Sequence, residues 1–276
     1  MDSISRRKML GFMGGAMVAG FAAGTLTTPK IAMSAAELPR EAKPFGWQYR
    51  KLDYKEVQPL VHEEFYFNGW GCGYAVLYGI VGLLGKKYGA PYNTFPFSMM
   101  EVGKSGTSEW GTLCGALLGA ASAMALFYGR KDRDPMVDEL FRWYETTAFP
   151  MYKPTKEVKK GMLKPLPTST SDSVLCHISV SRWAFTNGMG ANVPERSERC
   201  ARLSADVAKK TVEILNAKLD GKFKGTMAWS KDYKACTECH GGDPAKFSSP
   251  ILKGKMDCTP CHTGSEHVQN KLVNHP

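Results

Sequence analysis

The spacing of hydrophobic residues predicts helices along most of the chain. Between Val61 and Leu219, apolar side chains recur every three to five residues or form long unbroken runs. Such spacing places them on one face of a helix, and no segment shows the convincing alternation that is typical of a strand. We therefore predict a mainly α fold, with helices at 73–87, 109–128, 134–149 and 194–219.

Residue types at the ends of these runs support the assignment. Ser108 precedes the second run and Asp134-Pro135 opens the third, as expected for a capping side chain and a first-turn proline. The last run starts near Pro194 and is followed by Asp220-Gly221, a typical helix stop. Residues 153–173 are rich in Lys, Pro, Thr and Ser and are predicted to form a loop.

The chain changes character after Gly221. It becomes rich in Gly, Lys and Pro, with few consecutive apolar residues, and such a stretch cannot close a hydrophobic core alone. We predict a helical domain at 55–220 and an irregular segment at 221–276 that another component must organise.

The first 34 residues have the features of an export signal. Ser5-Arg6-Arg7 and a Leu at position 10 precede a weakly hydrophobic stretch rich in Gly and Ala, which ends near Ala32-Met33-Ser34. This pattern predicts a twin-arginine signal peptide at 1–34, the type used by proteins that cross a membrane already folded. The glycines make a retained spanning helix the weaker alternative. We expect a periplasmic protein that is not embedded in the membrane after cleavage.

Composition narrows the functional classes. The chain has 276 residues, 43% of them hydrophobic, which is sufficient for a buried core. The formal net charge of +10 at pH 7 includes four basic residues and one acidic residue in the first 34 positions. The remaining charges are interspersed and form no basic stripe with aromatic residues, so nucleic acid is not an expected partner.

Two motifs near the carboxyl end predict covalent haem. Each reads C-x-x-C-H, in which two cysteines form thioethers with the haem and the adjacent histidine binds the iron. A zinc site or two thioredoxin-like motifs are weaker alternatives, because zinc would leave two histidines without a role and redox motifs usually lie between a strand and a helix. We predict two haems c, attached through Cys236, Cys239, Cys258 and Cys261, with His240 and His262 as proximal ligands.

The spacing of the motifs predicts two neighbouring haems. Seventeen residues separate His240 from Cys258, so both groups are held on a short tether. His267 lies only five residues after His262, which favours the neighbouring haem or a partner chain as its target. Met256 is the nearest sulfur alternative, although Met usually serves in packing. The candidates for the sixth ligands are His267, His275, His62 and His177.

The other four cysteines are scattered over the helical region: Cys72, Cys114, Cys176 and Cys200. An oxidising compartment favours two disulfides among them. Export of a folded domain instead favours an iron-sulfur cluster built on thiolates before export. Gly115 and Gly119, with neighbouring alanines, would let another backbone or an inorganic group approach Cys114 closely. Both alternatives stay open on the residues alone.

The segment Cys114-Gly115-Ala116-Leu117-Leu118-Gly119 resembles the C-G-A-x-x-G motif of a family of redox proteins with four invariant cysteines. Cys72, Cys176 and Cys200 occur in the order that this family requires. Together with the two C-x-x-C-H motifs, residues 55–276 resemble the split-Soret cytochromes c of sulfate-reducing bacteria.

This resemblance implies a periplasmic homodimer with two c-type haems in each chain, stacked closely enough to split the Soret absorption band. It also implies two histidine ligands for each haem iron, with help from the partner chain. For Cys72, Cys114, Cys176 and Cys200 it implies an iron-sulfur site, for which 2Fe-2S is the favoured type.

These features lead to three functional hypotheses. The first is an electron carrier in which electrons pass between the cluster, the haems and a periplasmic redox partner, without a catalytic side chain. The second is a haem-dependent reductase of small oxyanions with an open coordination position on one iron. The third is a structural, disulfide-bonded haem module without a cluster.

Overall fold

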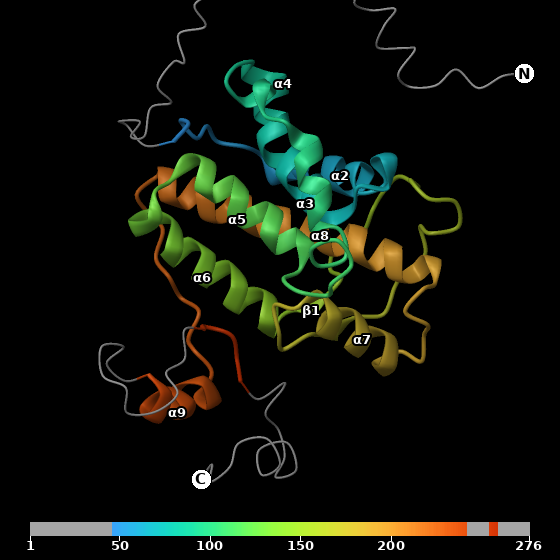
Figure 1. Cartoon of the computed structure of the whole chain (residues 1–276). Coiled ribbons are helices and arrows are strands. Elements are labelled where there is room, and N and C mark those ends of the chain that lie inside the picture. The colour runs from blue at the N-terminus through green and yellow to red at the C-terminus, as the bar shows by residue number, and fades with distance from the viewer. Residues whose placement is uncertain (1–45, 242–253, 259–276) are drawn as a thin grey trace, which may run out of the picture. The chain divides into compact units, whose positions relative to one another are not determined.

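The computed structural model describes residues 46–241 and 254–258, and within them the fold is mainly α, as predicted (Figure 1). The predicted signal at 1–34 lies outside the described residues. The helices are α2 (Tyr54–Glu64), α3 (Gly71–Leu77), α4 (Leu83–Tyr88), α5 (Gly115–Phe127), α6 (Arg130–Thr146), α7 (Cys176–Thr186), α8 (Pro194–Leu219) and α9 (Lys231–His240). Short 3-10 turns lie at Phe67–Gly69, Tyr92–Thr94 and Phe97–Gly103.

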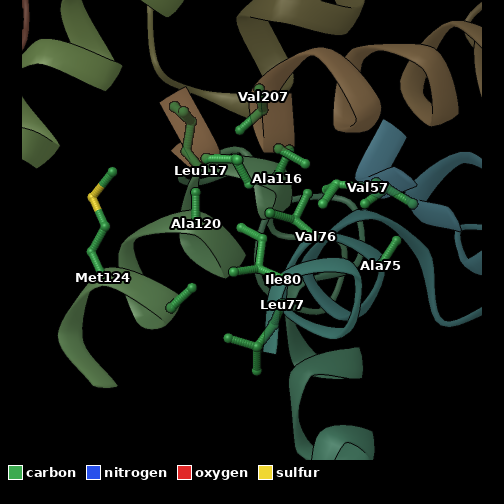
Figure 2. Close-up of a cluster of buried hydrophobic side chains, with 14 of the residues drawn as sticks. Val57, Ala75, Val76, Leu77, Ile80, Ala116, Leu117, Ala120, Met124 and Val207 are labelled. Atoms are coloured by element: carbon green, nitrogen blue, oxygen red, sulfur yellow. The ribbon is translucent and has the colours of Figure 1, made fainter. Parts of the chain in front are cut away.

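The long helix α8 contacts α2, α3, α5 and α6 and forms the middle of the core. Figure 2 shows its Val207 among side chains from α2, α3 and α5, including Val57, Val76 and Leu117, all of them fully buried. Helix α8 begins at Pro194 and ends at Leu219, as predicted. The apolar stripe of α8 and the residue types at its two ends predict the same bounds, so the sequence locates both ends of this helix.

Helices α3 and α5 pack at very short range. A Cβ atom at Gly119 would lie 2.5 Å from the carbonyl oxygen of Gly73, a distance that real Cβ atoms do not reach. The small side chains of Ala116 and Ala120, both fully buried, line the same helix. The close approach expected from the glycines and alanines around Cys114 is confirmed.

The helix predicted at 73–87 is present but contains a wide turn. Helical structure continues from Gly71 to Tyr88, with a π-helical turn at Tyr78–Gly82 between α3 and α4. A Cβ atom at Gly79 would lie 2.1 Å from Cγ2 of Val61, so the absence of a side chain lets α2 pack against this turn. Sequence periodicity did not indicate the extra residue that a π turn contains.

The predicted helix start at Glu109 is wrong. Residues 105–111 form turns with positive φ at Ser105, Thr107, Ser108 and Glu109, and α5 begins only at Gly115. Leu113 forms an isolated β-bridge with Leu175, and the N–H of Cys114 donates to the carbonyl of Val174. These contacts hold residues 112–114 extended, which the local sequence does not reveal.

The predicted helix start at Asp134 is also wrong, by one turn. Helix α6 begins at Arg130, and the N–H groups of Asp132 and Arg133 both donate to the carbonyl of Gly129. Pro135 therefore lies inside α6, at a position near the start where few backbone bonds are lost. Helix α6 ends before Pro150, as predicted, but already at Thr146, because Ala148–Phe149 form a short strand.

The predicted loop at 153–173 is largely irregular but contains one short strand. Strand β2 (Ser169–Thr170) pairs antiparallel with β1 (Ala148–Phe149), which follows α6. Helix α9 is an addition to the predicted irregular segment, and Ser230 caps it by accepting from the N–H of Tyr233 at 3.0 Å. Among the described residues no helix is long and apolar enough to cross a membrane.

Candidate iron centre and haem-attachment segment

Four cysteines from the starts or interiors of four different helices lie near one another in the helical domain. Cys72 belongs to α3, Cys114 directly precedes α5, Cys176 is the first residue of α7, and Cys200 belongs to α8. All four thiols are free in the described structure.

The four thiols lie within electrostatic reach of one another. Burial raises the pKa of Cys72, and Cys114, Cys200 and Cys176 add to the increase. Burial raises the pKa of Cys114 as well, and that of Cys176 to about 12, with contributions from neighbouring thiols. Several thiolates held together in a buried place require a compensating positive charge, such as that of metal ions.

The loop before α5 shapes the site. Gly106 has φ of +73°, and a Cβ atom there would lie 2.7 Å from Cβ of Cys176. The N–H of Cys176 donates to the carbonyl of Thr112 at 2.7 Å, which ties the start of α7 to the same loop. The left-handed turns that displaced the predicted helix start therefore bring Cys114 and Cys176 together.

The donor set fits iron. Thiolates are the ligands of iron-sulfur clusters. Within residues 46–241 and 254–258, no three Cys, His, Asp or Glu side chains are grouped tightly enough to hold a single metal ion.

A cavity of about 700 Å³ opens at three of these cysteines, Cys72, Cys176 and Cys200. His177 lines it together with Lys104 and Arg196, so its charged lining is mainly basic. The structure thus places His177, one of the candidate haem ligands, beside the cysteine site, where its Nδ1 lies 3.5 Å from Ser181 Oγ.

His62 occupies a different environment from the one expected. This candidate haem ligand lies inside α2, is 2% exposed, and its Nε2 lies 2.9 Å from Oε1 of Glu198. Tyr66 and Arg202 also bond to the Glu198 carboxylate. These bonds explain the lowered pKa of Glu198 despite its burial, and they engage His62 within the helical domain.

Two buried polar residues beside the cysteines were not found from the sequence. Tyr144 on α6 is fully buried, and its hydroxyl contacts both Cys114 and Ser179. Arg199 is 1% exposed and lies next to Cys200. A signal for Arg199 does exist, because with Leu203 and Val207 it follows the four-residue spacing of the apolar stripe of α8.

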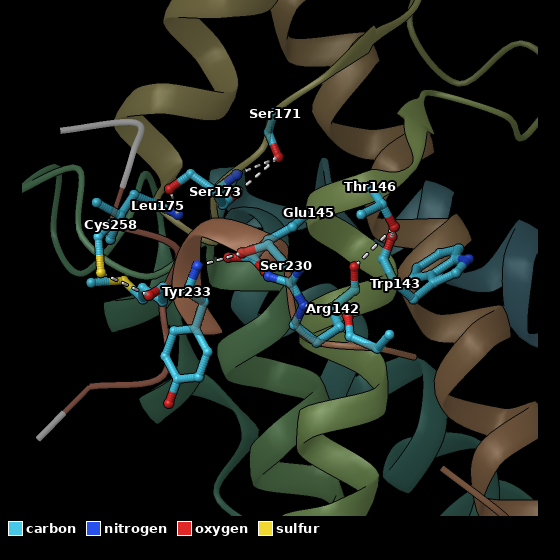
Figure 3. A network of polar contacts seen from close by, with 12 residues as sticks. Arg142, Trp143, Glu145, Thr146, Ser171, Ser173, Leu175, Ser230, Tyr233 and Cys258 are labelled. Atoms are coloured by element: carbon cyan, nitrogen blue, oxygen red, sulfur yellow. Dashed lines mark hydrogen bonds and ion pairs between the residues drawn. The ribbon is translucent and has the colours of Figure 1, made fainter. Parts of the chain in front are cut away.

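The haem-attachment segment, described at residues 221–241 and 254–258, docks on α6. The Glu139 carboxylate accepts from the N–H groups of Thr226 and Met227 at 2.8 and 2.9 Å. Arg142 donates to the carbonyl of Ala228 and forms a buried ion pair with Glu145. Figure 3 shows Arg142 and Glu145 beside Ser230, Tyr233 and Cys258.

The structure brings the first cysteines of the two C-x-x-C-H motifs, Cys236 and Cys258, together. Cys236 lies in α9, which ends at His240. The thiols of Cys236 and Cys258 are in hydrogen-bonding contact, and burial followed by this contact raises the pKa of Cys258 to about 11. Neighbouring first cysteines are the arrangement expected for neighbouring haems. The side chain of Cys239 and the residues Cys261, His262, His267 and His275 lie outside the described structure.

A second cavity has a volume of about 370 Å³. Its lining includes Leu113, the neighbour of Cys114, and Trp229 and Met256 of the haem-attachment segment. Met256 therefore faces this cavity while 47% exposed.

The fold and the four converging cysteines define a class of redox protein, and comparison with known families agrees. Residues 72–214, which span all four cysteines, match the family described as "Putative redox-active protein (C_GCAxxG_C_C)". This match covers more than half of the chain, which therefore belongs to that family.

Comparison with individual proteins identifies the particular branch. The chain is 47% identical over 283 residues to "Split-Soret cytochrome c" of Desulfovibrio desulfuricans (strain ATCC 27774 / DSM 6949 / MB), covering 99% of this chain and 100% of that protein. A solved structure described as "A novel iron centre in the split-Soret cytochrome c from Desulfovibrio desulfuricans ATCC 27774" is 51% identical, with a TM-score of 0.77. The match covers 84% of this chain and 96% of that chain. The predicted resemblance to split-Soret cytochromes c is confirmed.

Proposed function

We propose that the chain is a periplasmic electron-transfer protein that carries two haems c and an iron-sulfur cluster of the 2Fe-2S type. The observation that carries the proposal is the convergence of Cys72, Cys114, Cys176 and Cys200, all free, in the helical domain. When bound, the cluster and haems would each accept and release one electron. The relative whose description names a novel iron centre supports an iron centre in this chain.

The chain's own residues would hold and protect these groups. The four thiols would bind the cluster, and the buried donors of Tyr144 and Arg199 would face it. Buried Arg199 Nε has no hydrogen-bond partner among the described residues, as expected if a bound group completes the site. The C-x-x-C-H cysteines would attach the haems, and Glu139 would fix the start of that segment on α6.

The assembly and location form part of the proposal. The contact between Cys236 and Cys258 supports closely placed haems, and we propose a homodimer in which the partner chain supplies sixth ligands. The pair of arginines at Arg6-Arg7 supports export by the twin-arginine route to the periplasm, where a redox partner would exchange electrons.

Spectra with metal analysis of paired variants test the proposal. In the purified protein we expect low-spin haems, a split Soret band, and non-haem iron with sulfide. Cys114→Ser should lose most of the non-haem iron and sulfide while both haems stay, because only the cluster loses a ligand. Cys239→Ser should lose one haem while the non-haem iron and the sulfide stay.

The outcome that contradicts the cluster is specific. It would be a protein with haem iron alone, in which Cys72, Cys114, Cys176 and Cys200 resist alkylation until a reductant is added. Such a result would restore the disulfide alternative.

A further inference from the structure

Arg199 is a buried cation in direct contact with the cysteine site. It lies on α8 immediately before Cys200, and its side chain is 1% exposed. Among the described residues it forms no ion pair with a carboxylate, although nearby Arg202 on the same helix pairs with Glu198. A buried charge is costly unless an opposite charge or hydrogen bonds compensate it. The compensating group of Arg199 must therefore be sought in its surroundings.

The contacts of Arg199 point to the cysteines. Its Nη1 lies 3.9 Å from Sγ of Cys200, and its Nη2 donates to Oγ of Ser179 at 2.9 Å. The same Oγ accepts from the hydroxyl of Tyr144 at 2.9 Å, and this hydroxyl also contacts Cys114. A connected set of donors thus extends from Cys200 to Cys114. The Nε group is buried and has no described partner.

The acids closest to Arg199 are engaged elsewhere. Asp206, further along α8, interacts electrostatically with Arg199. However, burial raises the pKa of Asp206 to about 6, and its carboxylate accepts a hydrogen bond from the N–H of Met151 at 2.7 Å. Burial acts to lower the pKa of Arg199, and Cys200 and Tyr144 more than offset this effect. Among the described residues, Sγ of Cys200 lies 3.9 Å from the guanidinium of Arg199, whereas no carboxylate lies within ion-pair distance of it.

We infer that Arg199 is the counter-charge of the iron centre and that its positive charge raises the reduction potential of that centre. The inference rests on the proposed function, since it requires an iron centre on the four cysteines. Reduction adds one negative charge to such a centre, and a buried cation stabilises the more negative state more strongly. Net charge and hydrogen bonds to the sulfur ligands are known to set these potentials. Arg199 is a positioning residue and binds no iron itself.

The test compares the midpoint potential of the iron centre in the full protein and four variants. Arg199→Met and Arg199→Gln remove the charge, whereas Arg199→Lys keeps it. Arg182→Met is the matched control, because Arg182 lies on α7 with Cys176 but pairs with Asp172 at the surface. Iron, sulfide and haem contents are measured first, and the potential is then titrated with the spectrum of the non-haem iron as readout.

In the two neutral variants we expect the midpoint potential of the iron centre to fall by ~59 mV. For a one-electron centre this fall lowers the ratio of reduced to oxidised centre about tenfold at a given potential. Arg199→Lys should keep most of the potential, and Arg182→Met should leave it unchanged. An unchanged potential in either neutral variant that binds iron overturns the inference.

Loading of iron separates the remaining outcomes. If Arg199→Lys binds iron and neither neutral variant does, the result would support a requirement for the positive charge of residue 199 at the iron centre. Loss of iron from all three Arg199 variants would show a structural role and overturn the inference. A parent protein without non-haem iron would instead contradict the proposed function.

Discussion

Gly115, the residue after Cys114, shows how strongly the cysteine site depends on single atoms. A Cβ atom at this position would lie 2.0 Å from the carbonyl oxygen of Gly103 and 2.5 Å from Sγ of Cys72. The first obstacle is backbone, which cannot move aside like the end of a flexible side chain. The start of α5 can therefore approach Cys72 only because residue 115 has no side chain.

Gly115→Ala should destabilise the protein and weaken iron binding together. Overpacking of this kind costs about 1–3 kcal/mol, and here the displaced atoms include a proposed iron ligand. The free energy of unfolding from urea titrations and the content of non-haem iron check the expectation. The matched control is Gly225→Ala, because a Cβ atom there meets nothing within 4 Å. Normal stability with full iron in Gly115→Ala would contradict the packing argument.

At the scale of single elements, α6 is the support of the haem-attachment segment. The buried Glu139 carboxylate accepts from two backbone N–H groups and from the hydroxyl of Thr226. Burial acts to raise the pKa of Glu139, but these bonds and the nearby Lys210 reverse the effect and leave it below the usual value. The charged form of Glu139 is therefore the form that holds the segment.

Glu139→Gln should lower the free energy of unfolding at pH 7 by roughly 1.5 kcal/mol, the contribution of hydrogen bonds to a charged group. Because the pKa of Glu139 is lowered on folding, this contribution is present above the unfolded pKa of about 4.3 and is lost as the pH falls further. Urea titrations should therefore show a smaller difference in the free energy of unfolding between the parent protein and Glu139→Gln at pH 3.5 than at pH 7.

Glu213→Gln provides the control for this measurement. Glu213 is half exposed and lies 3.9 Å from Lys209, a surface pair that contributes little. If Glu139→Gln and Glu213→Gln changed stability equally at pH 7, the docking role of Glu139 would be wrong.

The elements that could be predicted from sequence are those whose local and tertiary preferences agree. Helix α8 has an apolar stripe, a first-turn proline and a glycine after its end, and its predicted bounds are confirmed. The start of α5 could not be predicted, because Ser108 and Glu109 adopt positive φ in a loop that is held by distant Val174 and Leu175. Such contacts depend on the completed fold.

The same reasoning applies to the candidate site. The four cysteines could be selected as a group from their order and from the C-G-A-x-x-G motif, but their convergence required the packing of α3, α5, α7 and α8. Tyr144 was not selected because nothing near it in the sequence differs from an ordinary buried tyrosine. Its contacts with Cys114 and Ser179 join residues more than 25 positions away.

At the scale of the whole molecule, the order in which the cofactors are inserted determines how variants are exported. If the cluster is built before export and the haems are attached afterwards, Cys114→Ser should stay mostly in the cytoplasm, since its domain lacks the group that completes the fold. Cys239→Ser should reach the periplasm with one haem fewer. Cell fractionation with haem staining and antibody detection measures both.

A precursor with Lys at positions 6 and 7 is the control for the route, and it should not be exported at all. Export of Cys114→Ser at the parental level, with Cys239→Ser also exported, would show that the cysteine site is not filled before transport.

The end of α6 has a consequence for how the two sites depend on each other. Tyr144 contacts Cys114, while its neighbour Glu145 interacts with the backbone of Asp257, the residue before Cys258. One helical turn therefore belongs to both sites. Filling the cysteine site would order the surface on which the haem-attachment segment rests, and the reverse would hold equally. We expect the cofactors to bind cooperatively, each increasing the affinity of the chain for the other.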